Sequence, residues 1–188
     1  NLYVIASILN LLPVDNISSV DVHNYAAANG LIDSLVNIGV GPIHKTLTRN
    51  GNYSHVVFPD AGAYHRYGGD FDDIGRIIFH KKRDQLTGEI TGLTSSYRGV
   101  HQDLTLQMAD LSKIKFDKPL LIVDDICDGG MTFIKIAEYL KAADPNVVID
   151  LFVTHGLFSK GEEVLHKAGI RNLITTNSLL RNPYGIPI

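Results

Sequence analysis

The residues best suited to chemistry lie in one run near the middle of the chain. The run joins two carboxylates to a glycine-containing loop: Asp124, Asp125, Asp128, Gly129, Gly130, Met131 and Thr132. Carboxylates accept hydrogen bonds from vicinal sugar hydroxyls, directly or through Mg²⁺. A loop that leads into a helix can turn backbone N–H groups toward an anion, and Thr132 can donate its hydroxyl to a phosphate oxygen. The run therefore predicts a site for a sugar with a phosphate at one end.

A simpler interpretation of this run is that the aspartates cap a helix and the glycines turn the chain. A pair of aspartates alone would favour that interpretation. Here the pair ends an apolar stretch and is followed at once by Asp-Gly-Gly-x-Thr, which favours the phosphosugar site. A Walker-type phosphate loop is excluded because no Gly-Lys-Ser/Thr sequence follows.

Three other polar groups end or follow apolar stretches. His23 could bind a metal or a phosphate oxygen, or be a structural histidine. Asp60 could be a ligand of Mg²⁺ or a helix cap. The basic triplet Lys81, Lys82 and Arg83 could stabilise a transferring phosphoryl group or be a solvated surface run. The segment 84–88, which follows the triplet, is expected to close over substrates.

The elements that must position these residues alternate between apolar, β-branched runs and helical patterns. Strands are expected at 18–23, 55–58, 74–80, 120–123, 147–153 and 172–175, and helices at 2–12, 131–143 and 160–168. Strands with continuous apolar runs are buried on both faces. We therefore expect an α/β fold, a doubly wound, mainly parallel sheet flanked by helices, with ligands beyond the carboxyl ends of the strands. The stretch 94–118 is expected to be a long loop with some helix.

The composition narrows the class of protein. The chain has 188 residues, of which 45% are hydrophobic and 20% charged, which is enough for a buried core. A net charge of −3 argues against a nucleic-acid partner. The single cysteine fits a reducing, cytoplasmic setting, and no apolar run is long enough for a membrane helix.

The run that contains Asp124 and Asp125 resembles the phosphoribosyl-diphosphate (PRPP) binding motif of type I phosphoribosyltransferases and PRPP synthetases. Four other segments resemble those of the synthetases and occur in the family order: Val20-Asp21-Val22-His23, Val57 to Ala63, His80 to Arg83, and Val153 to Ser159. The resemblance implies a type I phosphoribosyltransferase-like domain over 1–188, with 1–15 as the tail of a preceding N-terminal half. The Cys-Asp-Gly-Gly and Phe-Ser-Lys-Gly sequences are similar to a divergent bacterial and phage branch.

The resemblance also implies an activity, ribose-phosphate diphosphokinase. Such an enzyme transfers the diphosphoryl group of Mg-ATP to ribose 5-phosphate, giving PRPP and AMP, and forms homo-oligomers. It implies that Lys81 and Arg83 are catalytic and that His23 and Asp60 lie at the metal of Mg-ATP. The remaining implied residues bind ribose 5-phosphate: Asp124, Asp125, Asp128, Gly129, Gly130, Met131 and Thr132. Met131 stands where the family usually has glycine, and Gly129 where it usually has threonine, so the 5′-phosphate contacts are expected to differ.

Two other functions stay open. The chain could be a phosphoribosyltransferase that consumes PRPP to modify a base, although no segment that would recognise a base is identified. It could also be a non-catalytic regulator similar to PRPP-synthetase-associated proteins or to PRPP-sensing repressors. The intact His23, Asp60, Lys81 and Arg83 weigh against an inactive enzyme, and the acidic charge weighs against a DNA-binding repressor.

Overall fold

The structure is a computed structural model that describes residues 2–83, 90–100, 107–108, 110–179 and 185–187. Backbone contacts divide the chain into two units, Asn1–Pro42 and Ile43–Ile188, and each is described by itself. The domain boundary expected near residue 15 stays a prediction. The segment 84–88, which was expected to close over substrates, lies outside the described residues.

The N-terminal unit holds a two-stranded parallel sheet. Its elements are α1 (Leu2–Leu9), β1 (Ile17–Val20), α2 (Tyr25–Asn29) and β2 (Leu35–Ile38). The strand expected over 18–23 ends earlier, because Asp21 has a φ of 48°, a left-handed conformation that a β ladder does not continue. His23 therefore follows the strand instead of ending it.

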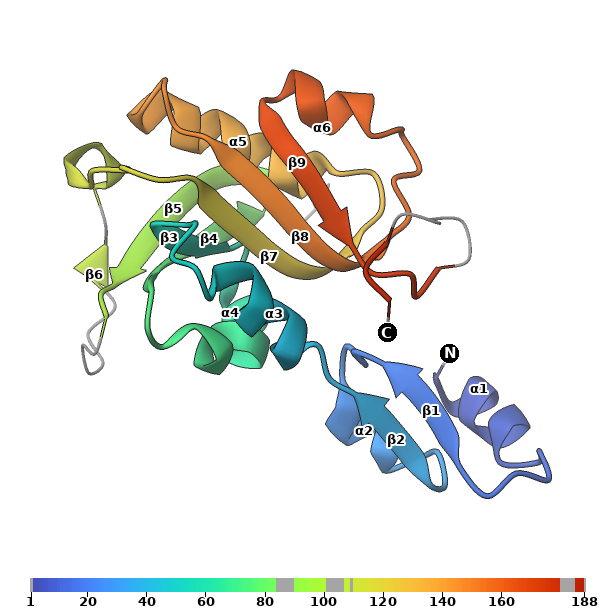
Figure 1. The fold of residues 1–188 in the computed structure, drawn as a ribbon. Helices are drawn as coiled ribbons and strands as arrows, with labels where there is room; N and C mark the ends of the chain where they lie inside the picture. The colour runs from blue at the N-terminus through green and yellow to red at the C-terminus, as the bar shows by residue number, and fades with distance from the viewer. Residues whose placement is uncertain (1, 84–89, 101–106, 109, 180–184, 188) are drawn as a thin grey trace. The chain divides into compact units, whose positions relative to one another are not determined.

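The C-terminal unit is built on a sheet with seven strands in the described residues. They are β3 (His55–Phe58), β4 (Gly75–Arg83), β5 (Ile90–Arg98), β6 (Gln107–Met108), β7 (Leu120–Cys127), β8 (Ile149–Gly156) and β9 (Ile170–Thr175). Their order is β6-β5-β4-β3-β7-β8-β9. The strands β4, β3, β7, β8 and β9 lie side by side in that order and run parallel. At one edge of the sheet, β5 pairs antiparallel with β4, and β6 pairs antiparallel with β5 (Figure 1).

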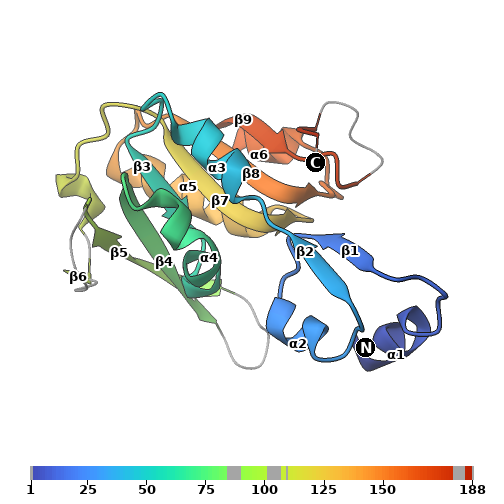
Figure 2. The same ribbon diagram turned by 60° about the horizontal axis from the view of Figure 1, so that its bottom comes forward.

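Helices cover both faces of this sheet. They are α3 (Gly41–Thr48), α4 (Ala61–Tyr67), α5 (Met131–Ala143), α6 (Glu163–Lys167) and the 3-10 turns Gly68–Phe71 and Leu111–Lys113. Helices α3 and α4 lie on one face, and α5 and α6 on the other (Figures 1 and 2). Successive residues of β8 reflect this, since Val153 packs in one core cluster with Ile136 of α5, whereas the ring of Phe152 lies 5.2 Å from that of His44 in α3. In the ranges described above, no helix has both the length and the apolarity needed to cross a membrane.

The predicted fold class is confirmed, and one stretch is corrected. Strand 55–58 and helix 131–143 have the predicted bounds. The stretch 94–118 was expected to be a long loop with some helix. It contains the 3-10 turn Leu111–Lys113, but it begins inside β5, which pairs with β4. Polar residues conceal this strand in the sequence, because Ser95 and Ser96 are buried and the hydroxyl of Ser96 lies 2.8 Å from Nε2 of His80.

A buried carboxylate joins β8 to β9 near the start of both strands. Asp150 is 1% exposed and accepts hydrogen bonds from Nε and Nη2 of Arg171 at 2.9 and 2.6 Å. It also accepts from the Tyr53 hydroxyl at 3.0 Å and the Asn172 amide at 3.0 Å. Burial, followed by the negative charge of Asp150, raises the pKa of Tyr53. Asp150 is therefore a structural charge whose two carboxylate oxygens are both hydrogen-bonded, and it fastens β8 to β9.

The substitution Asp150→Ala should lower the free energy of unfolding by about 3 kcal/mol, because it removes a buried, charged acceptor that Tyr53, Arg171 and Asn172 share. Urea denaturation followed by circular dichroism measures this change. The exposed Asp73→Ala is the control and should change stability by less than about 0.5 kcal/mol. Equal stability of the two variants would contradict a structural role for Asp150.

Candidate functional site

The acidic pair lies inside the second half of strand β7. The strand was expected to end at Val123, but it continues to Cys127, and Asp124 stands opposite Val153 of β8. The side chains of Asp124 and Asp125 are 14% and 7% exposed. The Asp125 N–H donates to Oδ1 of Asp124 at 2.9 Å. The strand thus holds two neighbouring carboxylates in a largely desolvated place.

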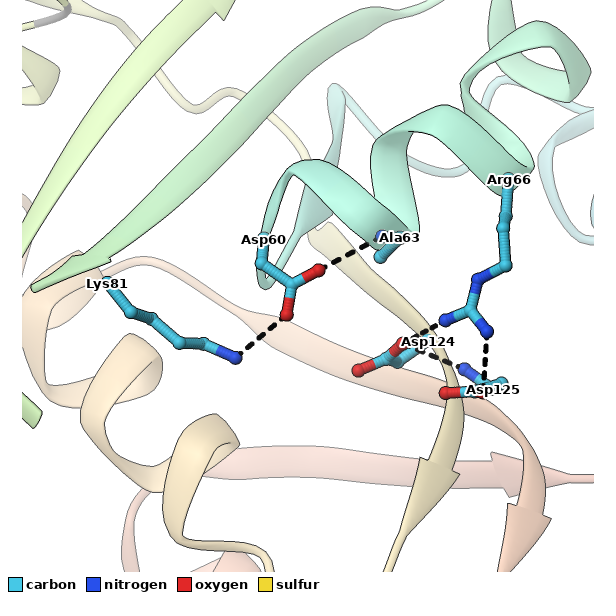
Figure 3. Close-up of polar contacts among 6 residues, drawn as sticks. All are labelled: Asp60, Ala63, Arg66, Lys81, Asp124 and Asp125. Atoms are coloured by element: carbon cyan, nitrogen blue, oxygen red, sulfur yellow. Dashed lines mark hydrogen bonds and ion pairs between the residues drawn. The ribbon is translucent and has the colours of Figure 1, made fainter. Parts of the chain in front are cut away.

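Arg66 of α4 joins the two carboxylates. Its Nη1 donates to Oδ2 of Asp125 at 2.6 Å, and its Nη2 donates to Oδ1 of Asp124 at 3.2 Å (Figure 3). Planar guanidinium groups suit this forked geometry. The sequence analysis did not identify Arg66. The possible helix cap at Asp60 was a signal that could have found it: a helix that starts after Asp60 carries Arg66 in its last turn.

Asp60 has two partners, one for each carboxylate oxygen. Its Oδ1 accepts the N–H of Ala63 at 3.0 Å and so caps α4, as the simpler interpretation of this residue expected. Its Oδ2 lies 3.0 Å from Nζ of Lys81 at the end of β4 (Figure 3). Burial acts against the charged form, but the Ala63 N–H and Lys81 prevail and lower the pKa of Asp60.

Lys81 lies near the carboxyl end of β4, where its side chain reaches Asp60. Its side chain is only 10% exposed and comes from strand β4, which is parallel to β3. Asp60 and Lys81 are therefore brought together by two neighbouring strands, whereas the acidic pair comes from β7 on the other side of β3. The backbone of Arg83 continues β4, and its side chain lies outside the described residues.

The electrostatics of the acidic pair favour a bound cation or hydrogen-bond donor. Burial first, and then the charge of Asp125, raise the pKa of Asp124 to about 7. Burial is the largest single effect and opposes the charge of Arg66, but the hydrogen bond to Asp125 together with the charges of Asp125, Asp124 and Tyr67 raises the pKa of Arg66. Arg66 contacts both carboxylates with one positive charge, so it does not by itself neutralise two negative charges, and the carboxylate oxygens can accept hydrogen bonds from the hydroxyls of a ligand.

The loop after β7 leads directly into helix α5. Gly130 has a φ of 75°, and a Cβ there would lie 2.9 Å from Cδ2 of Leu165, so glycine is required at this position. The N-cap residue of α5, Gly130, makes no side-chain hydrogen bond to the first N–H groups of the helix, and Thr132 lies in the first turn. A capless N-terminus of a 13-residue helix, preceded by Asp128 and two glycines, can bind an anion through its N–H groups. Met131 is 50% exposed beside it.

The two expected metal ligands lie in different units of the chain. His23 belongs to the N-terminal unit and Asp60 to the C-terminal unit, so their meeting at one metal stays a prediction. In the part of the chain that the structure describes, no three histidine, cysteine or acidic side chains gather as a metal site. Mg²⁺ is commonly held by one or two carboxylates, several waters and substrate phosphates. The residues therefore fit a magnesium ion that arrives with a polyphosphate substrate.

Comparisons with known proteins agree with this geometry. A family model described as the phosphoribosyl transferase domain matches residues 75–177, which is more than half of the chain and includes the acidic pair and its loop. A ribose-phosphate pyrophosphokinase of Mycoplasmopsis pulmonis is 27% identical over 182 residues, which are 93% of this chain and 51% of that protein. A putative ribose-phosphate pyrophosphokinase 2 of Lactococcus lactis is 32% identical over 66 residues, 35% of this chain and 20% of that protein.

One solved structure is similar over the whole chain. The crystal structure of phosphoribosylpyrophosphate synthetase from Mycobacterium smegmatis matches with a TM-score of 0.69 and 20% identity, covering 100% of this chain and 58% of that one. The chain is thus homologous, at low identity, to ribose-phosphate pyrophosphokinases. It spans about half the length of the Mycoplasmopsis relative and somewhat more than half of the Mycobacterium chain.

The substitution Arg66→Gln should lower the free energy of unfolding by about 2 kcal/mol, because two buried carboxylates lose their common donor. Chemical denaturation measures the loss. Adding Asp125→Asn to this variant should restore part of the stability, and the exposed Arg49→Gln should have little effect. If the single and double variants have the same free energy of unfolding, the lost hydrogen bond between Arg66 and Asp125 does not cause the destabilisation.

The substitution Asp124→Asn should stabilise the fold at pH 8 by about 1 kcal/mol. The pKa of Asp124 is about 7 in the fold, above its ordinary value, so the native protein loses stability as pH rises toward 7 and the amide variant does not. Urea denaturation at pH 5 and pH 8 should therefore give a larger gain at pH 8, with exposed Asp73→Asn as the control. A gain that is independent of pH would contradict the raised pKa.

Proposed function

This chain belongs to the phosphoribosyl transferase domain family, and from that premise we propose that it acts in ribose-phosphate diphosphokinase chemistry. The reaction transfers the diphosphoryl group of Mg-ATP to the 1-hydroxyl of ribose 5-phosphate, giving PRPP and AMP. The names of the two relatives, both ribose-phosphate pyrophosphokinases, favour this activity within the family. The observation that carries the proposal is the acidic pair on β7, fixed by Arg66 and followed at once by the anion-binding start of α5.

Ribose 5-phosphate binds along β7 and its loop in this proposal. Asp124 and Asp125 accept hydrogen bonds from the ribose hydroxyls, which relieve the repulsion between the two carboxylates. The 5′-phosphate is held by the Thr132 hydroxyl and by backbone N–H groups of the loop and the first turn of α5, which are Asp128, Gly129, Gly130, Met131 and Thr132. The contiguity of these residues in space follows from the strand, loop and helix that carry them.

The transfer step takes place toward β3 and β4. The sugar's 1-hydroxyl oxygen attacks the β-phosphorus, the bond to the oxygen that bridges the α- and β-phosphorus breaks, and AMP leaves with that electron pair. The hydroxyl proton passes to water. Lys81, together with Arg83, stabilises the charge on the transferring group, since phosphoryl transfer depends mainly on positioning and cations. Asp60 orients Lys81, and His23 and Asp60 are proposed to lie near the magnesium of Mg-ATP.

A second candidate is a phosphoribosyltransferase that consumes PRPP. The specific observation in its favour is the matched range 75–177, which contains Lys81 and the PRPP-binding run but neither His23 nor Asp60. The same acidic pair and loop would bind PRPP in that reaction. Assembly into homo-oligomers is also a proposal under either function.

The test is the release of AMP from Mg-ATP with and without ribose 5-phosphate, using this chain and the full encoded product. Lys81→Ala should reduce AMP formation by about a hundredfold or more, while ribose 5-phosphate still binds. The exposed Lys45→Ala is the matched control and should keep full activity. If Lys81→Ala keeps full activity, the role of Lys81 is wrong. If neither protein releases AMP but PRPP binds, the chain is a PRPP-consuming transferase or a sensor.

A further inference from the structure

The connection that follows β8 is fastened to the connection that follows β7. The N–H groups of Leu157 and Phe158 both donate to the carbonyl of Cys127, at 2.9 and 3.1 Å. The N–H of Ser159 donates to the carbonyl of Asp128 at 3.1 Å. Both connections lie at the same end of the sheet (Figure 1). The segment 157–161 is therefore held against the loop that is proposed to bind the 5′-phosphate.

The conformation of this segment is closely determined. Phe158 and Gly161 have left-handed φ values of 47° and 81°, and the Gly161 N–H donates to the Phe158 carbonyl at 2.8 Å. A Cβ at Gly156 would lie 2.4 Å from the Phe158 ring, so the ring packs directly on that glycine. The turn around Lys160 is thus set by its neighbours, which fixes the direction in which the lysine leaves the backbone.

The stem of Lys160 crosses the face of Gly129. A Cβ at residue 129 would lie 3.4 Å from Cε, 3.6 Å from Cδ and 3.9 Å from Cγ of Lys160. These are ordinary contact distances, so a larger side chain at 129 would collide with the stem. A residue no larger than alanine at position 129 therefore leaves room for the lysine stem to lie across the loop 128–132.

The ammonium group of Lys160 is available to a ligand. The residue is exposed, and no carboxylate in the described ranges lies within 4.0 Å of its Nζ. Asp124, Asp125 and Asp128 all contribute negative charge in this part of the chain, which opposes the binding of a phosphate dianion. The start of α5 supplies only partial positive charge. A full positive charge at Lys160 would offset that repulsion.

We propose that Lys160 binds the terminal phosphate monoester of the sugar ligand, lying over Gly129 opposite the start of α5. This inference rests on the proposed function, because it assumes that the loop 128–132 holds a sugar phosphate. A lysine acts as a mobile point charge for phosphate, and its contact with Gly129 directs that charge to the loop. Lys160 is a binding residue here, and it takes no part in bond making.

The experiment measures the dissociation constant of ribose 5-phosphate by isothermal titration calorimetry. Lys160→Ala should weaken binding by about tenfold to a hundredfold, which is the usual effect of losing a hydrogen bond to a charged group. Lys160→Arg should keep most of the affinity, because it retains the charge. The exposed Lys167→Ala of α6 is the matched control and should leave the dissociation constant unchanged. The difference between wild type and Lys160→Ala should shrink at high salt.

A double-mutant cycle tests the contact with Gly129. Gly129→Val should weaken binding in the wild-type chain but should add little to Lys160→Ala, because the valine acts by displacing the lysine stem. Additive losses would overturn this contact. Equal affinity of Lys160→Ala and wild type for ribose 5-phosphate would overturn the role of Lys160 and leave the proposed function standing. If the wild-type chain binds neither ribose 5-phosphate nor PRPP, both proposals fail together.

Discussion

Two carboxylates on adjacent residues of a buried strand repel one another, and the site is arranged around that repulsion. Burial and the negative charge of Asp125 raise the pKa of Asp124 to about 7. The hydrogen bonds that Arg66 donates to both carboxylates offset part of their repulsion. Arg66 can reach both carboxylates only if α4 lies against the end of β7. The two hydrogen bonds of Arg66 thus join α4, and with it Asp60 at its start, to this part of β7.

A chain of charged contacts extends from the acidic pair across the sheet edge. Arg66 joins β7 to α4, Asp60 begins α4, and Lys81 joins Asp60 to the end of β4 (Figure 3). Each member is held by at least one partner from another element. Under the proposed function, an incoming polyphosphate would meet cations and acceptors that are already oriented, which is how electrostatic stabilisation acts in phosphoryl transfer.

Glycine has two different uses in the loop beside this chain of contacts. Gly130 is required by its left-handed backbone and by the closeness of Leu165. Gly129 has no such backbone requirement, and the space above it is occupied by the stem of Lys160. Under the inference above, Lys160 supplies a positive charge to the phosphate that this loop is proposed to hold.

Much of the framework could be predicted because it depends on local pattern. The apolar run 55–58 and the helical spacing of 131–143 were sufficient for β3 and α5, since both are buried elements with strong periodicity. Strand β5 could not be predicted in this way. Its buried Ser95 and Ser96 look like loop residues until β4 provides the ladder that pairs with them.

The sequence by itself determined the α/β class, the acidic pair with its glycine loop, and the candidates His23, Asp60, Lys81 and Arg83. The α/β class and the acidic pair depend on residue types and on spacing within one segment, whereas the four candidates were chosen through the resemblance to the synthetases, and their roles stay predictions. Only the tertiary structure decided that Arg66 spans Asp124 and Asp125, that Asp60 pairs with Lys81, and that Lys160 lies over Gly129. The physical reason is that these contacts join residues far apart in the chain, and a hydrogen bond or ion pair depends on distances that only the packing of helices on the sheet sets.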